Sequence, residues 1–181
     1  MSLAITDCEY LFERYFNEQI FDHRDSRLMD KQTKIAVSMA RKLFKKVKGN
    51  EFSSEDIGVV FLSDIGPMES ITEYTSVMKE KGYVGINPSK FPNIMSATPL
   101  ARIAMDIKAK GPCISLLSPK ANKHALMYAF EQIAAGRCRA IMLIHITSSN
   151  NCFGCFIEDE ELLKKRGLHP KLIISEKGRN A

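Results

Sequence analysis

Between residues 111 and 125 the chain reads Gly111-Pro112-Cys113-Ile114-Ser115-Leu116-Leu117-Ser118-Pro119-Lys120-Ala121-Asn122-Lys123-His124-Ala125. The apolar run from Cys113 to Leu117 has the length and composition of a buried strand. Ser118 is a good helix N-cap, and Pro119 would then take the first helical position, where its missing N–H costs nothing. The stretch predicts a strand that turns sharply into a helix, the place where many α/β enzymes carry a nucleophile.

The same alternation of strand and helix extends over the rest of the chain. Apolar runs at Ile57–Leu62 and Ala140–Ile146 predict two further strands buried on both faces of a sheet. Weaker strands are predicted at Cys152–Ile157 and Leu172–Ile174. Between the strands, helical patterns are predicted over residues 30–48, 68–81, 94–107 and 121–135. We therefore expect a single α/β domain over residues 1–181, layered around a mixed sheet.

Three of the predicted helices have distinct patterns. In the helix predicted over residues 30–48, the apolar residues Ile35, Met39, Leu43 and Val47 recur every fourth position. Gly49-Asn50 is a typical signal for the end of a helix. The segment 121–135 is apolar on several sides, which predicts a buried central helix. Residues 7–21 combine acidic and aromatic side chains at a spacing that predicts an amphipathic helix.

Composition limits the classes of partner. The formal net charge is +5, from 26 basic and 21 acidic residues, and the basic group within 41–48 is typical of a solvated helix face rather than a nucleic-acid site. No apolar run approaches the roughly 20 residues of a membrane span, and the N-terminus lacks the basic-then-apolar order of a signal peptide. We expect a cytoplasmic protein without a cofactor and without nucleic-acid or membrane contacts, and the positive excess suits an acidic partner.

The five cysteines do not form a disulfide framework, because their number is odd and their spacing irregular. Cys113 and Cys138 have apolar or helical neighbours and are predicted to be small core residues. Cys152 and Cys155 form a C-x-x-C motif, which suggests a redox pair or half of a zinc site. No second pair of cysteines or histidines completes a zinc site, so we expect no metal.

Several spaced segments resemble the N-terminal half of a β-ketoacyl synthase, a family with the thiolase-like fold. The segments lie between Asp30 and Ile146 and are Asp30-Lys31-Gln32, Ile57-Gly58-Val59-Val60 followed by Ser63-Asp64-Ile65-Gly66, Asn87-Pro88-Ser89-Lys90-Phe91-Pro92-Asn93, Lys108-Ala109-Lys110-Gly111-Pro112 and Ala134-Ala135-Gly136-Arg137-Cys138-Arg139-Ala140. Ser115 and Ser118 stand where the family has Ser or Thr. The resemblance implies a thiolase-like half domain.

The chain departs from the family where the chemistry takes place. The family's turn reads Thr-Ala-Cys, and its cysteine is acylated; here Ser118, Pro119 and Lys120 occupy those three positions. The catalytic histidines and lysine of the family's second half have no counterpart before Ala181, and its early glycine-rich strand is not evident before Asp30. The resemblance implies a short relative without the nucleophilic cysteine.

Lys120, Ser118 and His124 are the candidate catalytic residues of this turn. A helix N-terminus favours a thiolate, whereas an ammonium there is mildly unfavourable, by about 0.3–1 kcal/mol when exposed. A buried Lys120 can become a nucleophile for a carbonyl, and His124, one turn further, can share its pocket. Ser118 is expected to be a cap, since no base is evident beside it. His145 is expected to be a hydrogen-bonded core histidine.

The family resemblance implies a non-condensing, ketosynthase-like subunit of fatty-acid or polyketide biosynthesis. Its partners would be an acyl carrier protein or a catalytic ketosynthase, and in the family the strand that matches 113–117 pairs with its dimer mate, which implies a homodimer or heterodimer. Two alternatives are a small enzyme that uses Lys120 with His124 on an acyl thioester or carbonyl, and a redox or metal module built on Cys152 and Cys155.

Overall fold

Six strands form one mixed sheet in the computed structural model, which describes residues 2–17 and 26–175. The strands are β1 (Ser2–Leu11), β2 (Ile57–Ser63), β3 (Cys113–Leu117), β4 (Ala140–Ile146), β5 (Cys152–Asp159) and β6 (Leu172–Ser175), and they lie in the order β3-β2-β4-β5-β1-β6. β2 is parallel to β3 and β4, whereas β5 is antiparallel to β4 and β1, and β6 is antiparallel to β1.

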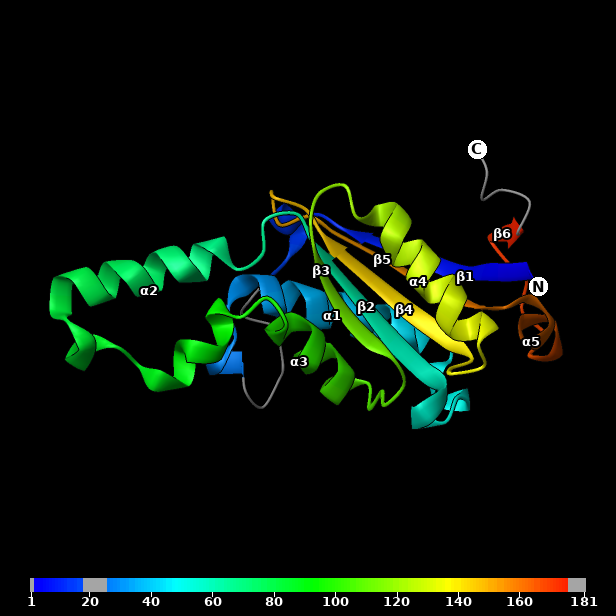
Figure 1. Cartoon of the computed structure of the whole chain (residues 1–181). Coiled ribbons are helices and arrows are strands. Elements are labelled where there is room, and N and C mark those ends of the chain that lie inside the picture. The colour runs from blue at the N-terminus through cyan, green and yellow to red at the C-terminus, as the bar shows by residue number, and fades with distance from the viewer. Residues whose placement is uncertain (1, 18–25, 176–181) are drawn as a thin grey trace.

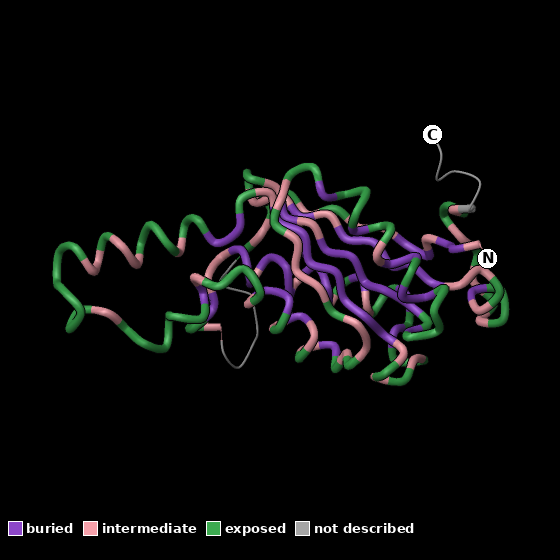
Figure 2. The backbone as a smooth tube through the Cα atoms, in the orientation of Figure 1, coloured by how far each residue is buried: buried purple, intermediate pink, exposed green. Residues whose placement is uncertain are grey.

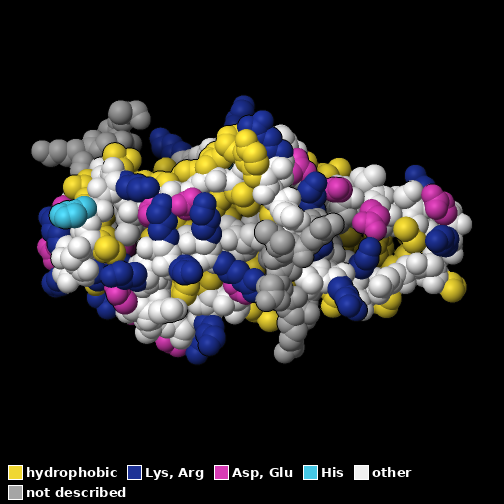
Figure 3. Space-filling model, turned by 180° about the vertical axis from the view of Figure 1, so that it is seen from behind, with side chains coloured by type: hydrophobic (Ala, Val, Ile, Leu, Met, Phe, Trp, Pro, Cys, Tyr) yellow, Lys and Arg dark blue, Asp and Glu magenta, His cyan; other side chains and the backbone are white. Residues whose placement is uncertain are grey.

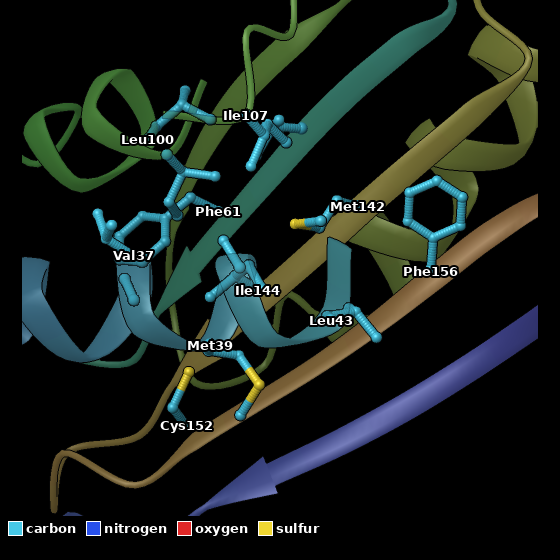
Figure 4. Packing of buried hydrophobic residues seen from close by; sticks show 14 of the residues in the cluster. Val37, Met39, Leu43, Phe61, Leu100, Ile107, Met142, Ile144, Cys152 and Phe156 are labelled. Carbon is cyan, nitrogen blue, oxygen red and sulfur yellow. The ribbon is translucent and has the colours of Figure 1, made fainter. Parts of the chain in front are cut away.

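Helices cover both faces of this sheet (Figure 1). They are α1 (Lys31–Lys46), α2 (Met68–Lys81), α3 (Thr98–Asp106), α4 (Asn122–Ala134) and α5 (Glu160–Lys165). α1 and α3 pack on one face, where Val59, Phe61, Met142, Ile144 and Phe156 point (Figure 4). α4 packs on the other face over Val60, Ile141 and Leu143. The predicted layered α/β fold with a mixed sheet is confirmed.

α1 forms because its sequence supplies both a cap and an apolar stripe. The Asp30 carboxylate accepts a hydrogen bond from the backbone N–H of Thr33 at 2.8 Å, and the predicted stripe Ile35, Met39, Leu43 and Val47 is buried. The end differs from the prediction, since α1 stops at Lys46 and the left-handed residue is Lys48 (φ 53°) rather than a glycine.

α2 and the segment that follows it project from the body as an arm (Figure 1), which we define as residues 67–97. None of the α2 residues is buried, and Figure 2 shows the arm mostly exposed while the central strands of the sheet are buried. The ring of Tyr74 packs edge-on against Phe91, with 6.3 Å between centroids, and Lys90 pairs with Glu73 at 3.1 Å. These contacts join the two limbs of the arm to each other but not to the core.

The predicted helix over residues 7–21 is wrong as far as the structure describes it. Residues 2–11 form β1, which pairs with β5 on one side and β6 on the other, and residues 18–21 lie outside the described residues. A register shift between Ile5 and Asp7 breaks the strict alternation that identifies a strand. The early strand that the sequence did not reveal is therefore present, without the glycines of the family.

Two other predicted helices differ from the structure. The helix expected over 94–107 begins only at Thr98, because Pro99 is accommodated in a first turn. The helix expected at 121–135 buries one side only: Ala125, Ala129 and Ile133 face the sheet, whereas its outer residues Leu126 and Met127 are exposed. In the isolated chain α4 is not a fully buried central helix.

A buried ion pair links α5 to the end of α1. Glu158 is completely buried, and both of its carboxylate oxygens accept hydrogen bonds from Arg166 Nη1 at 2.9 Å. The Thr6 hydroxyl also donates to Glu158. The guanidinium lies over the Phe52 ring at 4.5 Å and donates to the carbonyl of Val47. Arg166 thus neutralises the buried carboxylate of Glu158 and also donates to a backbone carbonyl at the end of α1.

Removing this arginine is expected to be costly. Arg166→Ala leaves the Glu158 carboxylate buried without its cation, which costs about 3–5 kcal/mol. Urea unfolding followed by circular dichroism measures the loss, and Arg139→Ala, at an exposed position of a 3.9 Å pair, is the control with a change below about 1 kcal/mol. Equal losses for the two variants would contradict the role given to the buried pair.

A second charge cluster fixes β1 to α1. Glu9 accepts from Lys42 at 2.7 Å and from Lys46 at 2.5 Å, and these lysines hold the pKa of the Glu9 carboxyl below its usual value. Because the pKa of Glu9 is lower in the folded state, its ion pairs stabilise the protein fully at pH values above the unfolded-state pKa of about 4.3. This stabilisation is lost as the pH falls through the folded-state pKa.

Glu9→Gln is therefore expected to destabilise the protein at pH 7 by less than about 1 kcal/mol, since both lysines are largely exposed. The difference from the wild type should diminish as the pH falls through the lowered folded-state pKa of Glu9, because the carboxylate is then protonated. Urea unfolding at pH 7 and at successively lower pH values, with Glu69→Gln on α2 as the control, measures this. A difference that stays the same at low pH would show that charge is not its origin.

Candidate functional site

The predicted nucleophile turn follows β3 at the carboxyl edge of the sheet. Ser118 continues the ladder, since its N–H donates to the Ser63 carbonyl at 3.0 Å. The Ser118 hydroxyl accepts from the backbone N–H of Lys120 at 3.2 Å, and Ala121 N–H donates to the Ser118 carbonyl. The prediction that Ser118 caps the helix directly is wrong, because residues 118–121 form a separate turn and α4 begins at Asn122.

The structure does not enclose the candidate catalytic residues. Lys120 lies in the turn and His124 in the first part of α4, and both are exposed. Burial is what turns a lysine into a carbonyl nucleophile, and an exposed side chain lacks it. The assignment of Lys120, Ser118 and His124 to the nucleophile turn remains a prediction from the sequence.

β3 itself differs from the buried strand predicted. It is the edge strand next to β2, and Cys113 and Leu117 at its ends are exposed. The prediction that Cys113 is a core residue is wrong, although partial desolvation raises the pKa of its thiol. Cys138 is buried as predicted, and burial raises its pKa to about 11.

A histidine–aspartate pair lies at the same edge, after β2 and at the end of β4. His145 Nε2 is 2.8 Å from Asp64 Oδ1, and Asp64 Oδ2 accepts from Ser148 N–H at 3.1 Å. The hydrogen-bonded role of His145 is confirmed. The sequence did not identify Asp64 as its partner, although Leu62 and His145, opposite one another in the parallel pairing, could have suggested it.

Beside this pair is a polar cavity of about 160 Å³ between the start of α1, the β2–α2 loop and the β4–β5 turn. Gln32 and Ser148 are among its lining residues, and Gln32 Nε2 donates to Ser63 Oγ at 3.2 Å. Ser63 Oγ also accepts from Gly66 N–H at 3.0 Å. The carboxyl ends of the parallel strands therefore carry a hydrogen-bonded polar network.

The C-x-x-C motif cannot act as a pair. Both cysteines lie in β5, where residues three apart point to opposite faces: Cys152 belongs to the core beneath α1, and Cys155 to the core beneath α4. Burial raises the pKa of both thiols, that of Cys155 to about 12. Within residues 2–17 and 26–175, no three His, Cys, Asp or Glu side chains gather as metal ligands do. The redox or metal hypothesis is wrong.

The chain is similar to known ketosynthases in sequence and in fold. No family model matches it. A 3-oxoacyl-[acyl-carrier-protein] synthase 2 from Staphylococcus aureus is 30% identical over 97 residues, which are 52% of this chain and 24% of that protein. The synthase 2 of a Synechocystis strain is 23% identical over 128 residues, 68% of this chain and 30% of that protein. The chain thus spans less than a third of these curated relatives.

Solved structures show the same fold. One is a complex of a type II polyketide acyl carrier protein with its ketosynthase. A chain of that complex superposes on this one with a TM-score of 0.85 at 11% identity, over 96% of this chain and 67% of that one. A chain from a ketosynthase in complex with its chain length factor, from Xenorhabdus doucetiae, gives 0.64 at 14% identity, over 88% and 79%. The chain therefore shares its fold with these ketosynthase structures.

The exposure of Lys120 leads to a specific prediction about its reactivity. Lys120→Ala should change the free energy of unfolding by less than about 0.5 kcal/mol, because an exposed side chain outside the core is removed. Borohydride should trap no imine between the wild-type protein and acyl thioesters or carbonyl compounds, as measured by intact mass. A trapped adduct that Lys120→Ala abolishes would instead establish a lysine enzyme.

Proposed function

We propose that this chain is a non-condensing, ketosynthase-like subunit that acts beside a catalytic ketosynthase in a pathway served by an acyl carrier protein. The proposal rests on the turn after β3, where Lys120 is exposed and where the sequence resemblance predicts that it takes the position of the family's acylated cysteine. A thioester cannot be formed on an ammonium group, and the hydroxyl of Ser118 is engaged with the turn backbone. Condensation would have to take place on a partner chain.

The outer edge of β3, which pairs with no strand among residues 2–17 and 26–175, supports the partner-subunit part of this proposal. An edge strand presents free N–H and C=O groups, which bind another strand readily. Hydrogen bonds alternate along a strand, and Ser118 N–H and the Pro112 carbonyl both face β2. The N–H of Ser115 therefore points away from the sheet, where a strand of another subunit could accept it.

Apolar side chains border this edge. Leu117 is 55% exposed and packs beside Gly66, and Met95 and Ile65, on the segments next to it, are 51% and 43% exposed. Ser115 Oγ donates to the Ser96 carbonyl at 3.0 Å, which holds the base of the arm against β3. Apolar groups around an open edge are typical of a surface that is covered in an assembly.

The similar solved structures agree with such a role. One is an acyl carrier protein in complex with its ketosynthase, and two are ketosynthases with a chain length factor. Within the described residues no helix is long and apolar enough to cross a membrane.

Ser115→Pro tests the proposal at β3, because proline removes the outward N–H while the bonds to β2 remain. The wild type should form a dimer or co-purify with a ketosynthase of its source organism, and the variant should lose more than about 90% of this association, an effect of at least ~1.4 kcal/mol. Light scattering coupled to size exclusion measures it, and circular dichroism confirms folding.

Cys113→Lys is a second variant for the same edge, since an exposed lysine on an edge strand opposes strand pairing. A wild type that stays monomeric and binds no ketosynthase would refute the proposal. Ketide formation by the isolated protein from acyl and malonyl thioesters would refute its non-condensing part.

A further inference from the structure

Three exposed aromatic rings, one half-buried ring and one exposed arginine form a continuous cluster where β1 ends, and we call it the aromatic patch. It consists of Tyr10, Phe12, Arg14, Tyr15 and Phe153. The ring centroids of Tyr10 and Phe12 are 4.7 Å apart, those of Tyr10 and Phe153 are 6.5 Å apart, and those of Phe12 and Tyr15 are 6.1 Å apart. The Arg14 guanidinium lies 5.4 Å from the Phe12 centroid and 4.8 Å from that of Tyr15.

The aromatic patch leaves apolar side-chain surface exposed to solvent. Tyr10 is 48% exposed, Phe12 43% and Tyr15 67%. Phe153 is half-buried and packs against the border of the core beneath α4, whereas Tyr10, Phe12 and Tyr15 belong to neither core cluster. Figure 3 shows hydrophobic side chains gathered along the upper border of the rear face, with basic side chains beside them. Tyr, Phe and Arg are the residues enriched where protein interfaces bind most strongly.

Arg14 gives the patch its charge. No carboxylate among residues 2–17 and 26–175 pairs with Arg14, whose only partners there are the two rings. The neighbouring acid, Glu13, is already paired with Lys31 at 2.5 Å. Further along β1, lysines likewise neutralise Asp7 and Glu9. The rings fix the plane of the guanidinium and leave its N–H groups for an outside carboxylate or phosphate.

The position of the patch separates it from the proposed subunit interface. β3 is one edge of the sheet, whereas β1 lies four positions away, beyond β2, β4 and β5. A strand added to β3 therefore leaves the patch uncovered, and one subunit can bind two partners at once. A second partner is what a pathway based on a carrier protein requires.

We infer that the aromatic patch docks an acidic acyl carrier protein, with Arg14 on a carboxylate or phosphate of that protein and with Phe12 and Tyr15 on apolar groups around it. This inference rests on the proposed function, because the proposed function supplies the carrier protein as the partner and the inference adds the surface to which that partner binds. Charge complementarity selects this partner: the patch is cationic, and the nearest acids of the chain are occupied.

Arg14→Glu tests the inference in the full chain. Titration calorimetry with holo acyl carrier protein from the source organism should show binding to the wild type that weakens with salt and is weakened more than about tenfold by the charge reversal. Tyr15→Ala should weaken it by a similar factor through lost apolar contact. Lys79→Glu, an equal charge change on the exposed outside of α2, is the control, with less than about a threefold effect.

The possible results distinguish a failure of the docking site from a failure of the proposed function. Binding that Arg14→Glu and Tyr15→Ala leave unchanged, or that Lys79→Glu weakens equally, overturns the docking site and leaves the proposed function standing. A wild type that binds a ketosynthase but no carrier protein also overturns the site. A wild type that binds neither overturns the proposed function as well. Arg14-dependent sedimentation with phosphatidylglycerol vesicles, without carrier binding, would assign the patch to a membrane surface and overturn the inference.

Discussion

The pairing of β2 with β3 on one side and β4 on the other is the constraint on which the rest of the domain depends. Every residue of β2 is buried, because α1 and α3 cover one of its faces and α4 the other. Parallel strands need helical crossovers, so this one strand dictates where the helices lie. It also brings the carboxyl ends of three strands to a common edge, where the Lys120 turn, the Asp64–His145 pair and the polar cavity are found.

The turn after β3 places a cation, Lys120, just before the N-terminus of α4. A helix N-terminus stabilises negative charge and disfavours positive charge. Lys120 is exposed and precedes the first residue of α4, so solvent screens this unfavourable interaction. The strand, turn and helix therefore form without an anionic side chain at the turn.

Much of the fold could be predicted from the sequence, and the errors have physical origins. β2, β4 and α2 were predicted within one residue of their bounds, because continuous apolar runs and glycine stops are local signals. β1 was mistaken for a helix because its acids, Asp7 and Glu9, owe their place to lysines of α1 and to Lys171, which are distant in sequence. The apolar run of β3 predicts a strand but not whether the neighbour that covers it belongs to the same chain.

The exposed arm has a consequence for how the domain can vary. Since α2 places no side chain in the core, substitutions along it escape the packing penalties that restrict α1, α4 and the strands. Most positions of α2 can therefore change at little cost in stability, whereas changes in the sheet and in the helices that cover it meet a packed core.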